Sequence, residues 1–459
     1  MTLSLFGDVA LLLEVLGVIA AAHALMHTRT PQGAIGWVLG LLLLPALTLV
    51  PYLFLGASRF RGYLKRHRGA LPRERQAMPA DAGEERYAAL TTMLGRPFRA
   101  GHRVRLLVDG DETFGAIFAA IAEARHTLLV QFFIFHDDGL GRRMQQALLE
   151  RAAAGVRVCV LYDGVGSYDL PRRYVEALRA GGVEIHPFAT RRLRNRFQLN
   201  FRNHRKIVVV DGERAFIGGL NVGDEYLGLK PPLAPWRDTH MELHGPAAAD
   251  LQQLFADDWE WITGVSPPLH PAPAGSGEAR VLAVSCGPAD PQETGSLFVT
   301  AAINAARRRI WLTTPYFVPD HSVRAALQLA ALRGLDVRVL IPARADHHMV
   351  FLASCLHAHY ALRAGVRVFR YQPGFLHQKV LLVDDDCAAV GSLNLDSRSF
   401  RLNFEASALV LDAGFARQVE AMLESDFARS SEVDPREYHD APYLRRVAMH
   451  VARLFDPIL

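Results

Sequence analysis

The chain has 459 residues, 50% of them hydrophobic and 21% charged, a composition that predicts two or three folded domains and argues against disorder. A formal net charge of +4 is too small to indicate a nucleic-acid-binding protein. The four cysteines are Cys159, Cys286, Cys355 and Cys387. Because none forms a CxxC pair, they predict free thiols in a reducing compartment and argue against disulfides or structural zinc.

Two apolar stretches open the chain, and they predict a membrane anchor over residues 1–60. The first, 9–26, is interrupted by Glu14 and His23, whereas the second, 36–56, carries no charge. At about 1.5 Å per residue the second stretch spans roughly 31 Å, which matches a bilayer core. A cleavable signal peptide is the alternative for the first stretch. The start of the chain, MTLSLFGD, has no positively charged side chain, and Glu14 lies within the apolar run. Both features disfavour that alternative, so we expect two transmembrane helices.

Basic residues predict the orientation of this anchor. After the second stretch come Arg59, Arg61, Lys65, Arg66, Arg68, Arg73 and Arg75, whereas the loop between the stretches contains only Arg29. The positive-inside rule then places both termini and everything after residue 57 in the cytoplasm. We expect the basic juxtamembrane linker, 61–99, to lie against anionic headgroups.

From residue 100 onward, one pattern of strands and helices occurs twice. The first copy has predicted strands at 104–109, 127–135, 156–163 and 206–211, and predicted helices at 113–124, 140–154 and 171–181. Segments 309–317, 334–342, 365–371 and 377–385 echo 127–135, 155–163, 182–188 and 204–212 in the same order. Such alternation predicts an α/β fold with parallel strands and helical crossovers. Two tandem domains follow, 100–265 and 280–459, separated by a stretch rich in Pro, Ala and Gly.

The strongest signal is the motif HxKxxxxD, which also occurs twice. Its copies are His204, Lys206 and Asp211, and His377, Lys379 and Asp384. Asn221 and Asn394 follow their histidines at the same spacing, after a turn of small residues. On a strand, residues i and i+2 project from one face, so each His and Lys enter one pocket. The two aspartates complete the motif, but they fall on odd offsets and are expected to brace the strand end.

This set of residues suits phosphate chemistry. Lysine and asparagine side chains donate to nonbridging oxygens, where negative charge builds in the transition state. One histidine can attack phosphorus while the other protonates the departing oxygen. A single HxK motif could be an ordinary strand end, but two copies with matched asparagines favour catalysis.

Longer segments around the motifs resemble the phospholipase D superfamily and, within it, the bacterial cardiolipin synthases. They are residues 201–228, WRDTH at 236–240, residues 376–400, NFE at 403–405, TPQGAIGW at 30–37 and FDPIL at 455–459. Gln378 departs from the pattern, which has a small residue there. It lies on the opposite face from His377 and Lys379, so we expect little effect.

The resemblance implies two tandem phospholipase D-like α/β/α sandwich domains related by a pseudo-twofold axis, in the bacterial inner membrane. Two phosphatidylglycerol molecules would give cardiolipin and glycerol through a phosphohistidine, without metal or cofactor. By the resemblance, His204 is the nucleophile and His377 the general acid and base. The near-symmetry of the halves leaves that order open. Phosphatidylglycerol and anionic membrane lipids are the implied partners, and nucleic acid is not.

Two downstream carboxylates are predicted to orient the histidines. A buried carboxylate on the far ring nitrogen fixes the tautomer of a histidine. Pairing in the superfamily crosses between the halves, which places Glu405 near His204 and Asp238 near His377. A surface position is the alternative for each carboxylate.

Two further features are weaker. Residues 443–455 form a basic amphipathic pattern, for which packing on the second domain and contact with lipid headgroups both stay open. Cys355, His357 and His359, or His347 and His348, could be metal ligands, but residues i and i+2 of a helix do not face each other.

Several functions remain open from the sequence. A phospholipase D would use water in place of a lipid hydroxyl, and another phosphatidyltransferase would use a different alcohol. A nuclease is disfavoured by the anchor, and a non-catalytic membrane scaffold is disfavoured by two intact motifs. Acyl preference, phosphatidylethanolamine as co-substrate and a homo-oligomeric state are not decided.

Overall fold

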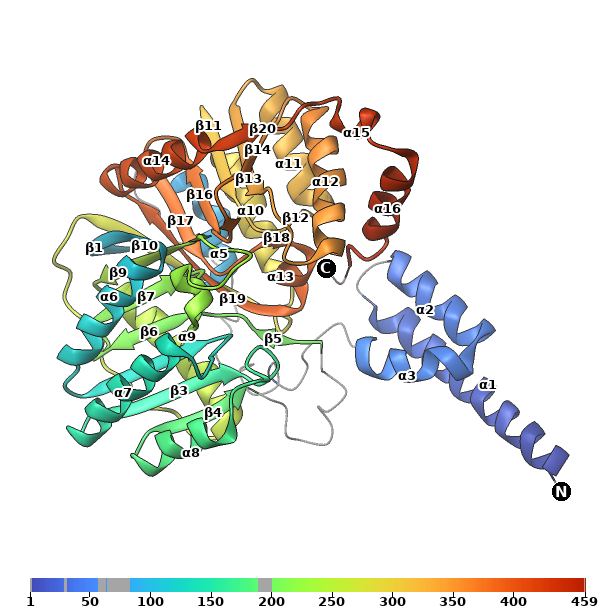
Figure 1. Ribbon diagram of the computed structural model, residues 1–459, viewed down its shortest axis with the longest axis horizontal. Helices are drawn as coiled ribbons and strands as arrows, with labels where there is room; N and C mark the ends of the chain where they lie inside the picture. Colours follow the sequence, from blue (N-terminus) through green and yellow to red (C-terminus); the bar gives the residue numbers. More distant parts are fainter. Residues whose placement is uncertain (1, 29–30, 57–62, 64–82, 189–199, 458) are drawn as a thin grey trace.

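The computed structural model describes residues 2–28, 31–56, 63, 83–188, 200–457 and 459 (Figure 1). Arg29 and the basic residues between 59 and 75 lie outside these ranges. The N-terminal part consists of helices α1 (Thr2–His27), α2 (Pro31–Leu43) and α3 (Pro45–Leu55). Among the described residues, one helical segment, Gly7–His27, is long and apolar enough to cross a membrane, with a mean hydropathy of 2.2.

The predicted second transmembrane helix over 36–56 is wrong as a single helix. The backbone leaves the helical region at Leu44, with φ −138° and ψ 58°, and Pro45 begins a new helix. Proline has no N–H to continue the helix and disfavours helical backbone in the residue before it. Helices α2 and α3 contain 13 and 11 residues, about 20 and 17 Å, so neither alone reaches across a bilayer.

Helices α2 and α3 form an antiparallel hairpin. The Thr48 hydroxyl donates to the Gly40 carbonyl at 2.8 Å, near the turn of the hairpin. Towards its open end, the Trp37 and Tyr52 rings lie 5.1 Å apart. The chain therefore runs out along α2 and returns along α3.

The hairpin packs along the C-terminal part of α1. At the hairpin turn, a Cβ on Gly17 would lie 2.5 Å from the Leu41 carbonyl oxygen, so only glycine allows this approach. At the open end, the Tyr52 hydroxyl lies 2.7 Å from His23 Nδ1. The hairpin turn thus reaches the level of Gly17, about 15 Å along α1 from its C-terminal end at His27.

The rest of the chain is built on strands that occur in the same order in two halves. The first half contributes β1 (Arg99–Val108), β2 (Thr127–Phe132), β3 (Arg157–Asp163), β4 (Glu184–Phe188), β6 (Ile207–Val210), β7 (Arg214–Gly218) and β9 (Thr239–His244). The second contributes β10 (Ala279–Cys286), β11 (Arg309–Thr313), β13 (Asp336–Pro342), β14 (Arg367–Tyr371), β16 (Val380–Val383), β17 (Cys387–Gly391) and β19 (Asn403–Leu411). Their spatial orders, β4-β3-β2-β6-β7-β9-β1 and β14-β13-β11-β16-β17-β19-β10, correspond strand by strand. Antiparallel pairing of β1 with β10 joins them, and β20 (Ser430–Glu432) pairs with β14 at the edge.

The expectation of parallel strands holds for only part of each half. Strands β2, β3 and β4 are parallel, as are β11, β13 and β14. Strands β6, β7, β9 and β1 pair antiparallel, and so do their counterparts. A tight turn at Asp211 and Gly212, both with positive φ, connects β6 directly to β7, which makes this pair antiparallel.

Helices cover both faces of each half, as buried apolar strands require. On the outer faces lie α6 (Asp109–Glu123), α7 (Gly139–Ala153) and α8 (Arg172–Ala180), and α10 (Thr294–Ala305), α11 (His321–Leu332) and α12 (His348–Leu362). On the inner faces lie α9 (Ala247–Thr263) and α14 (Ala413–Ala428). Along β2, Leu128 packs in the outer core and Leu129 in the inner core, which contains residues of both halves.

Shorter elements complete the chain. They are α5 (Ala88–Leu94), α13 (Ser397–Arg401), α15 (Glu437–Asp440), α16 (Tyr443–Arg453), the 3-10 helices η1 (Glu85–Tyr87) and η3 (Asp224–Leu227), and the short strands β5 (Arg202–Asn203), β8 (Trp236–Arg237), β12 (Phe317–Val318), β15 (Phe375–Leu376) and β18 (Leu395–Asp396).

The buried carboxylate of Asp258 on α9 ties the inner helix to the first motif. It accepts hydrogen bonds from Arg205 at 2.8 Å, from Asn203 at 2.7 Å and from Gln131 at 2.8 Å. Arg205 and Asp258 are both buried. Asp258→Ala would leave a buried guanidinium unpaired, so we expect the free energy of unfolding to fall by about 3–5 kcal/mol.

Thermal and denaturant unfolding in detergent would measure this loss. Glu176→Ala is the matched control, because its ion pair with Arg172 is exposed on α8 and should contribute less than about 0.5 kcal/mol. Equal stability of the two variants would contradict the structural importance of the Asp258 network.

Candidate active site

Each HxK motif is held against the opposite half by main-chain contacts. Strand β5, just before His204, pairs with β19 of the second half, and His204 N donates to the Phe404 carbonyl at 2.9 Å. Strand β15, just before His377, pairs with β8 of the first half, and His377 N donates to the Arg237 carbonyl at 2.8 Å. These exchanged strand pairs bring the two motifs to one place between the halves.

The two carboxylates lie where the crossed pairing expected from the sequence puts them. Nδ1 of His204 lies 2.9 and 3.0 Å from the oxygens of Glu405, and Nδ1 of His377 lies 2.7 Å from Asp238. With its Nδ1–H donated to a carboxylate, each neutral imidazole presents the unprotonated Nε2 on its other side. All four side chains are buried.

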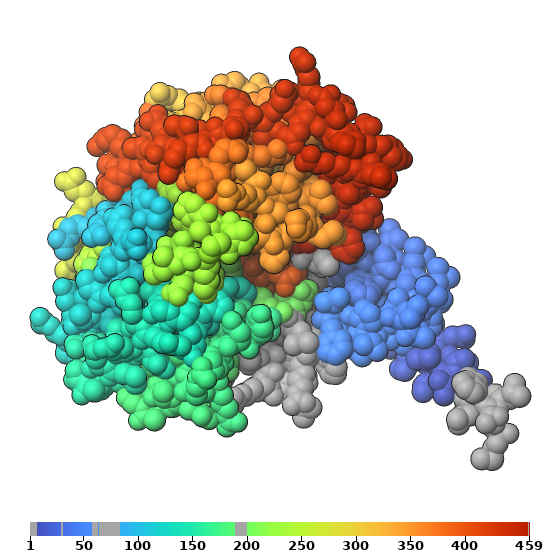
Figure 2. Space-filling model, in the orientation of Figure 1, coloured from blue at the N-terminus to red at the C-terminus, as the bar shows by residue number. Residues whose placement is uncertain are grey.

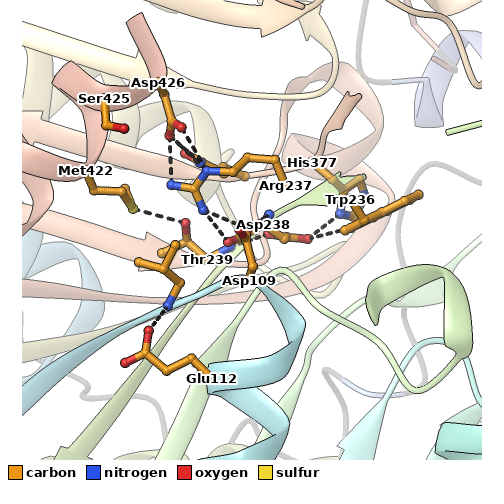
Figure 3. A network of polar contacts seen from close by, with 12 residues as sticks. Asp109, Glu112, Trp236, Arg237, Asp238, Thr239, His377, Met422, Ser425 and Asp426 are labelled. Carbon is orange, nitrogen blue, oxygen red and sulfur yellow. Dashed lines mark hydrogen bonds and ion pairs between the residues drawn. The ribbon is translucent and has the colours of Figure 1, made fainter. Parts of the chain in front are cut away.

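The surroundings of the two carboxylates differ. Glu405 accepts hydrogen bonds from the Ser392 hydroxyl at 2.5 Å and from the Asn403 amide at 3.1 Å. Asp238 accepts from the Thr239 backbone N–H at 2.8 Å (Figure 3). Gly219 takes the place that Ser392 has in the second half, because a Cβ there would lie 2.0 Å from the Asp238 carboxylate.

Both motif lysines are buried beside their histidines. Lys206 Nζ donates to the His204 carbonyl at 2.7 Å, and Lys379 Nζ lies 2.9 Å from His377 Nδ1. Burial lowers the pKa of Lys379 to about 8 and moves the pKa of Lys206 well below its usual value. An anion in the cavity would favour the charged ammonium of both side chains.

Both histidines are neutral near pH 7. Burial lowers the pKa of His204 to about 4 and that of His377 to about 4, although the neighbouring carboxylates act in the opposite direction. Burial would raise the pKa of Glu405, but His204 and Lys206 lower it overall, so the carboxylate stays ionised. The site therefore contains neutral imidazoles oriented by carboxylate anions.

A cavity of about 540 Å³ opens over this group. His204, His377, Asn221 and Asn394 all line it, as the sequence analysis expects of a shared pocket. The Asn221 amide nitrogen donates to the Tyr226 hydroxyl at 3.0 Å, which fixes its direction. Asn394 Oδ1 is buried without a hydrogen-bond partner among the described residues.

The third residue of each motif lies away from the cavity. The Asp211 carboxylate accepts the backbone N–H groups of 125–127, and Asp384 accepts those of 307–309, at the start of β2 and of β11. Both aspartates have positive φ, 51° and 52°. Asp211 and Asp384 therefore brace the ends of β6 and β16 that are far from the cavity. Their position does not support a catalytic role.

Gln378 has a larger part than the sequence analysis expected. It is fully buried, and its amide donates to Asp426 on α14 at 2.8 Å. Arg237 pairs with the same carboxylate at 2.8 Å and also contacts Asp109 at 2.8 Å (Figure 3). In the first half, Arg205 of the motif itself pairs with Asp258. Each buried inner-helix carboxylate thus has an arginine, supplied by different segments.

Aromatic rings that the sequence analysis did not single out flank both histidines. The Phe133 ring lies 5.0 Å from His204, and the Trp236 ring lies 5.0 Å from His377. Both also line the cavity. Trp236 is the first residue of the WRDTH segment, two residues before Asp238, and this position could have indicated that it lies at the site. Phe133 could not have been distinguished from other apolar residues of the predicted strand 127–135.

The residues weighed as metal ligands have other contacts. His357 Nε2 lies 2.9 Å from Asp456, His359 stacks on Tyr438 at 4.1 Å, and Cys355 receives a contact from Arg370. The four cysteines are buried and free.

Comparison with known proteins gives the family. The profile described as "Cardiolipin synthase, PLD-like domain" matches residues 117–259 and 299–427, one segment in each half. The chain belongs to this family. Cardiolipin synthase A of Pseudomonas aeruginosa strain LESB58 is 56% identical over 464 residues, covering 97% of this chain and 95% of that protein. Cardiolipin synthase A of Pseudomonas putida strain GB-1 is 55% identical over 472 residues, covering 99% and 98%.

Solved structures share the fold at low identity. Phosphatidylserine synthase of Haemophilus influenzae Rd KW20 superposes with a TM-score of 0.61 at 15% identity, covering 82% of this chain and 100% of that one. Polyphosphate kinase of Porphyromonas gingivalis gives a TM-score of 0.51 at 13% identity, covering 76% and 52%. The mixed α/β fold with phospholipase D-like domains, expected from the sequence, is confirmed.

The crossed carboxylate of Glu405 offers a test of this site. Glu405→Gln keeps the volume but puts an amide N–H where His204 needs an acceptor, so we expect kcat for phosphodiester turnover to fall about 10³-fold with little change in KM. Loss of the charge lowers the pKa of His204 further, so the histidine stays neutral and the defect is one of orientation. Steady-state kinetics with a phosphodiester lipid would measure it.

Ser392→Ala is the control, because it removes only one of the donors to Glu405 and should reduce kcat by less than about tenfold. Near-normal kcat in Glu405→Gln, in protein of unchanged melting temperature, would show that the contact does not position His204 for turnover.

Proposed function

We propose that this protein is a cardiolipin synthase that transfers a phosphatidyl group from one phosphatidylglycerol to another and releases glycerol. The observation that carries the proposal is a single cavity lined by His204 and His377, each with a carboxylate from the opposite half. One oriented, neutral imidazole that can attack phosphorus and a second that can carry a proton when phosphate is bound suit a two-step phosphoryl transfer. Relatives at 55–56% identity over nearly the whole chain bear the name Cardiolipin synthase A.

In the first step, Nε2 of His204 attacks the phosphorus of one phosphatidylglycerol. A P–N bond forms, the P–O bond to the headgroup glycerol breaks, and His377 in its imidazolium form gives its proton to the leaving oxygen. The bound phosphate anion favours that imidazolium. Lys206, Lys379, Asn221 and Asn394 donate to the nonbridging oxygens as charge builds on them.

In the second step, the terminal hydroxyl of another phosphatidylglycerol attacks the phosphohistidine. His377, now neutral, takes the hydroxyl proton, the new P–O bond forms and the P–N bond to His204 breaks. Cardiolipin leaves, and both histidines return to their starting states. Water or another alcohol could follow the same route, so the choice of acceptor separates this synthase from a phospholipase D.

Phosphatidylglycerol vesicles with EDTA present provide the test of this function. We expect purified protein to form cardiolipin and glycerol in equal amounts, because no step requires a metal ion. Mass spectrometry of the lipids, with an enzymatic glycerol assay, would measure both products. Phosphatidic acid alone would mean that water is the acceptor.

Histidine variants separate catalysis from a scaffold role. His204→Ala should form neither adduct nor product, because the nucleophile is absent. His377→Ala should lose turnover of phosphatidylglycerol, because the departing glycerol has no acid, but it should still form an adduct on His204, detected by peptide mass spectrometry, from a nitrophenyl phosphodiester whose leaving group needs no proton. An adduct on His377 in the His204→Ala protein would reverse the assignment of the two histidines. Cardiolipin formation by the doubly substituted protein would contradict the proposed site.

We further propose that α1 alone crosses the membrane, in place of the two spans expected from the sequence. The α2–α3 hairpin would then enter the bilayer to about half its depth and return on the same side. Both Arg29 and the basic residues 59–75 follow α1, whereas residues 1–27 contain no Lys or Arg. The positive-inside rule then puts the two phospholipase D-like domains, 100–265 and 280–459, in the cytoplasm and the N-terminal end of α1 outside.

Cysteine labelling tests this topology. We expect Asp8→Cys, near the exposed start of α1, to react with a membrane-impermeant maleimide in intact spheroplasts, because one crossing puts it outside. Glu176→Cys on α8 should react only after lysis. Protection of Asp8→Cys until lysis would restore the two-span arrangement with both ends inside.

A further inference from the structure

Helix α16 buries one face against the second half and leaves an apolar stripe exposed on the other. Met449 and Ala452 are buried, packed with Leu356 and Ala353 of α12. The opposite side carries Leu444, Val447, Val451 and Leu454, of which Leu444 is 79% exposed and Leu454 74%. Spacings of three and four residues place these side chains in one row along the helix. Packing on α12 therefore leaves the stripe unused.

A basic hollow of about 610 Å³ adjoins α16. Arg324, Arg363 and Arg453 line it, together with Tyr360 and Leu332. Arg453 donates to the Tyr360 hydroxyl at 2.9 Å, and the Arg324 guanidinium lies 5.8 Å from the centre of the same ring. In the part of the chain that the structure describes, none of the three arginines forms an ion pair with a carboxylate. Positive charge here is therefore not balanced by the protein.

We propose that α16 and this arginine hollow together bind the surface of a bilayer that contains anionic phospholipids. Apolar side chains at helical spacing can enter the headgroup region, and neighbouring arginines attract lipid phosphates. Helix α16 also lies on the side of the second half that is nearest the N-terminal helices, among which α1 is long enough to span a membrane (Figures 1 and 2). Both regions can therefore contact one bilayer.

The segment after α16 connects this surface to the catalytic cavity. Asp456 is fixed by His357 at 2.9 Å, and the Leu459 carbonyl accepts the Arg398 N–H at 2.8 Å. Leu459 itself lines the cavity. Docking of α16 would therefore set the height of the cavity edge above the lipid surface. This consequence rests on the proposed function, whereas the binding of α16 to lipid does not.

A fluorescent probe on the stripe tests the proposal in the full-length protein. Leu444→Cys can be labelled with an environment-sensitive dye, because the four native cysteines are buried. In vesicles of phosphatidylcholine with phosphatidylglycerol, we expect a blue shift of the dye and its quenching by doxyl-labelled lipid. Vesicles of phosphatidylcholine alone should give clearly weaker quenching, and so should high salt. Glu176→Cys on α8, labelled in the same way, should show neither effect.

Charge variants test the hollow separately. Arg324→Gln with Arg363→Gln should weaken docking of the Leu444 probe about fivefold or more, since each arginine contributes to attraction by anionic lipid. Arg172→Gln on α8 is the control and should leave docking unchanged. An unquenched probe at both Leu444→Cys and Val451→Cys in phosphatidylglycerol vesicles would overturn the proposal, as would quenching that is equal without phosphatidylglycerol. Because quenching requires no turnover, these outcomes are independent of whether the protein makes cardiolipin.

Discussion

The exchange of carboxylates between the halves is the constraint on which the active site depends. Two histidines and two lysines are buried together, and ionised groups in such a place need oppositely charged partners nearby. Glu405 and Asp238 supply the negative charge, and each serves the histidine of the other half. One half alone would present a histidine without its acceptor and a buried carboxylate without its donor. The halves therefore form one unit around the candidate site, although each has its own outer helices and its own set of strands in the joined sheet.

Hydrogen bonds to the backbone at both ends of each motif strand hold the two motifs in position for this exchange. Asp211 and Asp384 fix one end of β6 and β16, and the β5–β19 and β8–β15 pairs fix the other. Behind the motifs, the first half pairs Asp258 with Arg205, whereas the second pairs Asp426 with Arg237 and Gln378. A neutral glutamine is acceptable in the second motif because the arginine comes from the crossing segment. Each half therefore pairs the buried carboxylate of its inner helix with an arginine, although the two arginines come from different segments.

The sequence sufficed for features that repeat at fixed spacing. His204, His377 and their asparagines could be assigned to one cavity because strand periodicity and duplication constrain them together. Lys206 and Lys379, expected in the same pocket, are instead buried beside their histidines and are not among the residues that line the cavity. The arginine behind Gln378 could not be predicted, because Arg237 is distant in sequence and meets Asp426 only through tertiary packing. Strands β6 and β7 are antiparallel because of the tight turn at Asp211 and Gly212, and the spacing of apolar residues along the chain does not predict this turn.

In the apolar N-terminal segment, composition alone did not predict where the helices begin and end. Residues 36–56 are apolar throughout, and a hydropathy profile does not show where such a stretch turns back on itself. Pro45 starts a new helix, and the absence of a side chain at Gly17 lets the turn pack against α1. The difference matters for a lipid enzyme, because an odd number of crossings places the start of α1 and the catalytic halves on opposite sides.

A substrate headgroup must enter a buried cavity while its acyl chains stay in the bilayer. That requirement is met only if the halves keep a fixed height and tilt at the membrane surface. If α1 alone spans the membrane, with the α2–α3 hairpin beside it as proposed, the anchor lies at one place on the molecule and leaves the tilt of the catalytic halves free. A second contact on these halves would fix that tilt, and the exposed stripe of α16 occupies a suitable place for it.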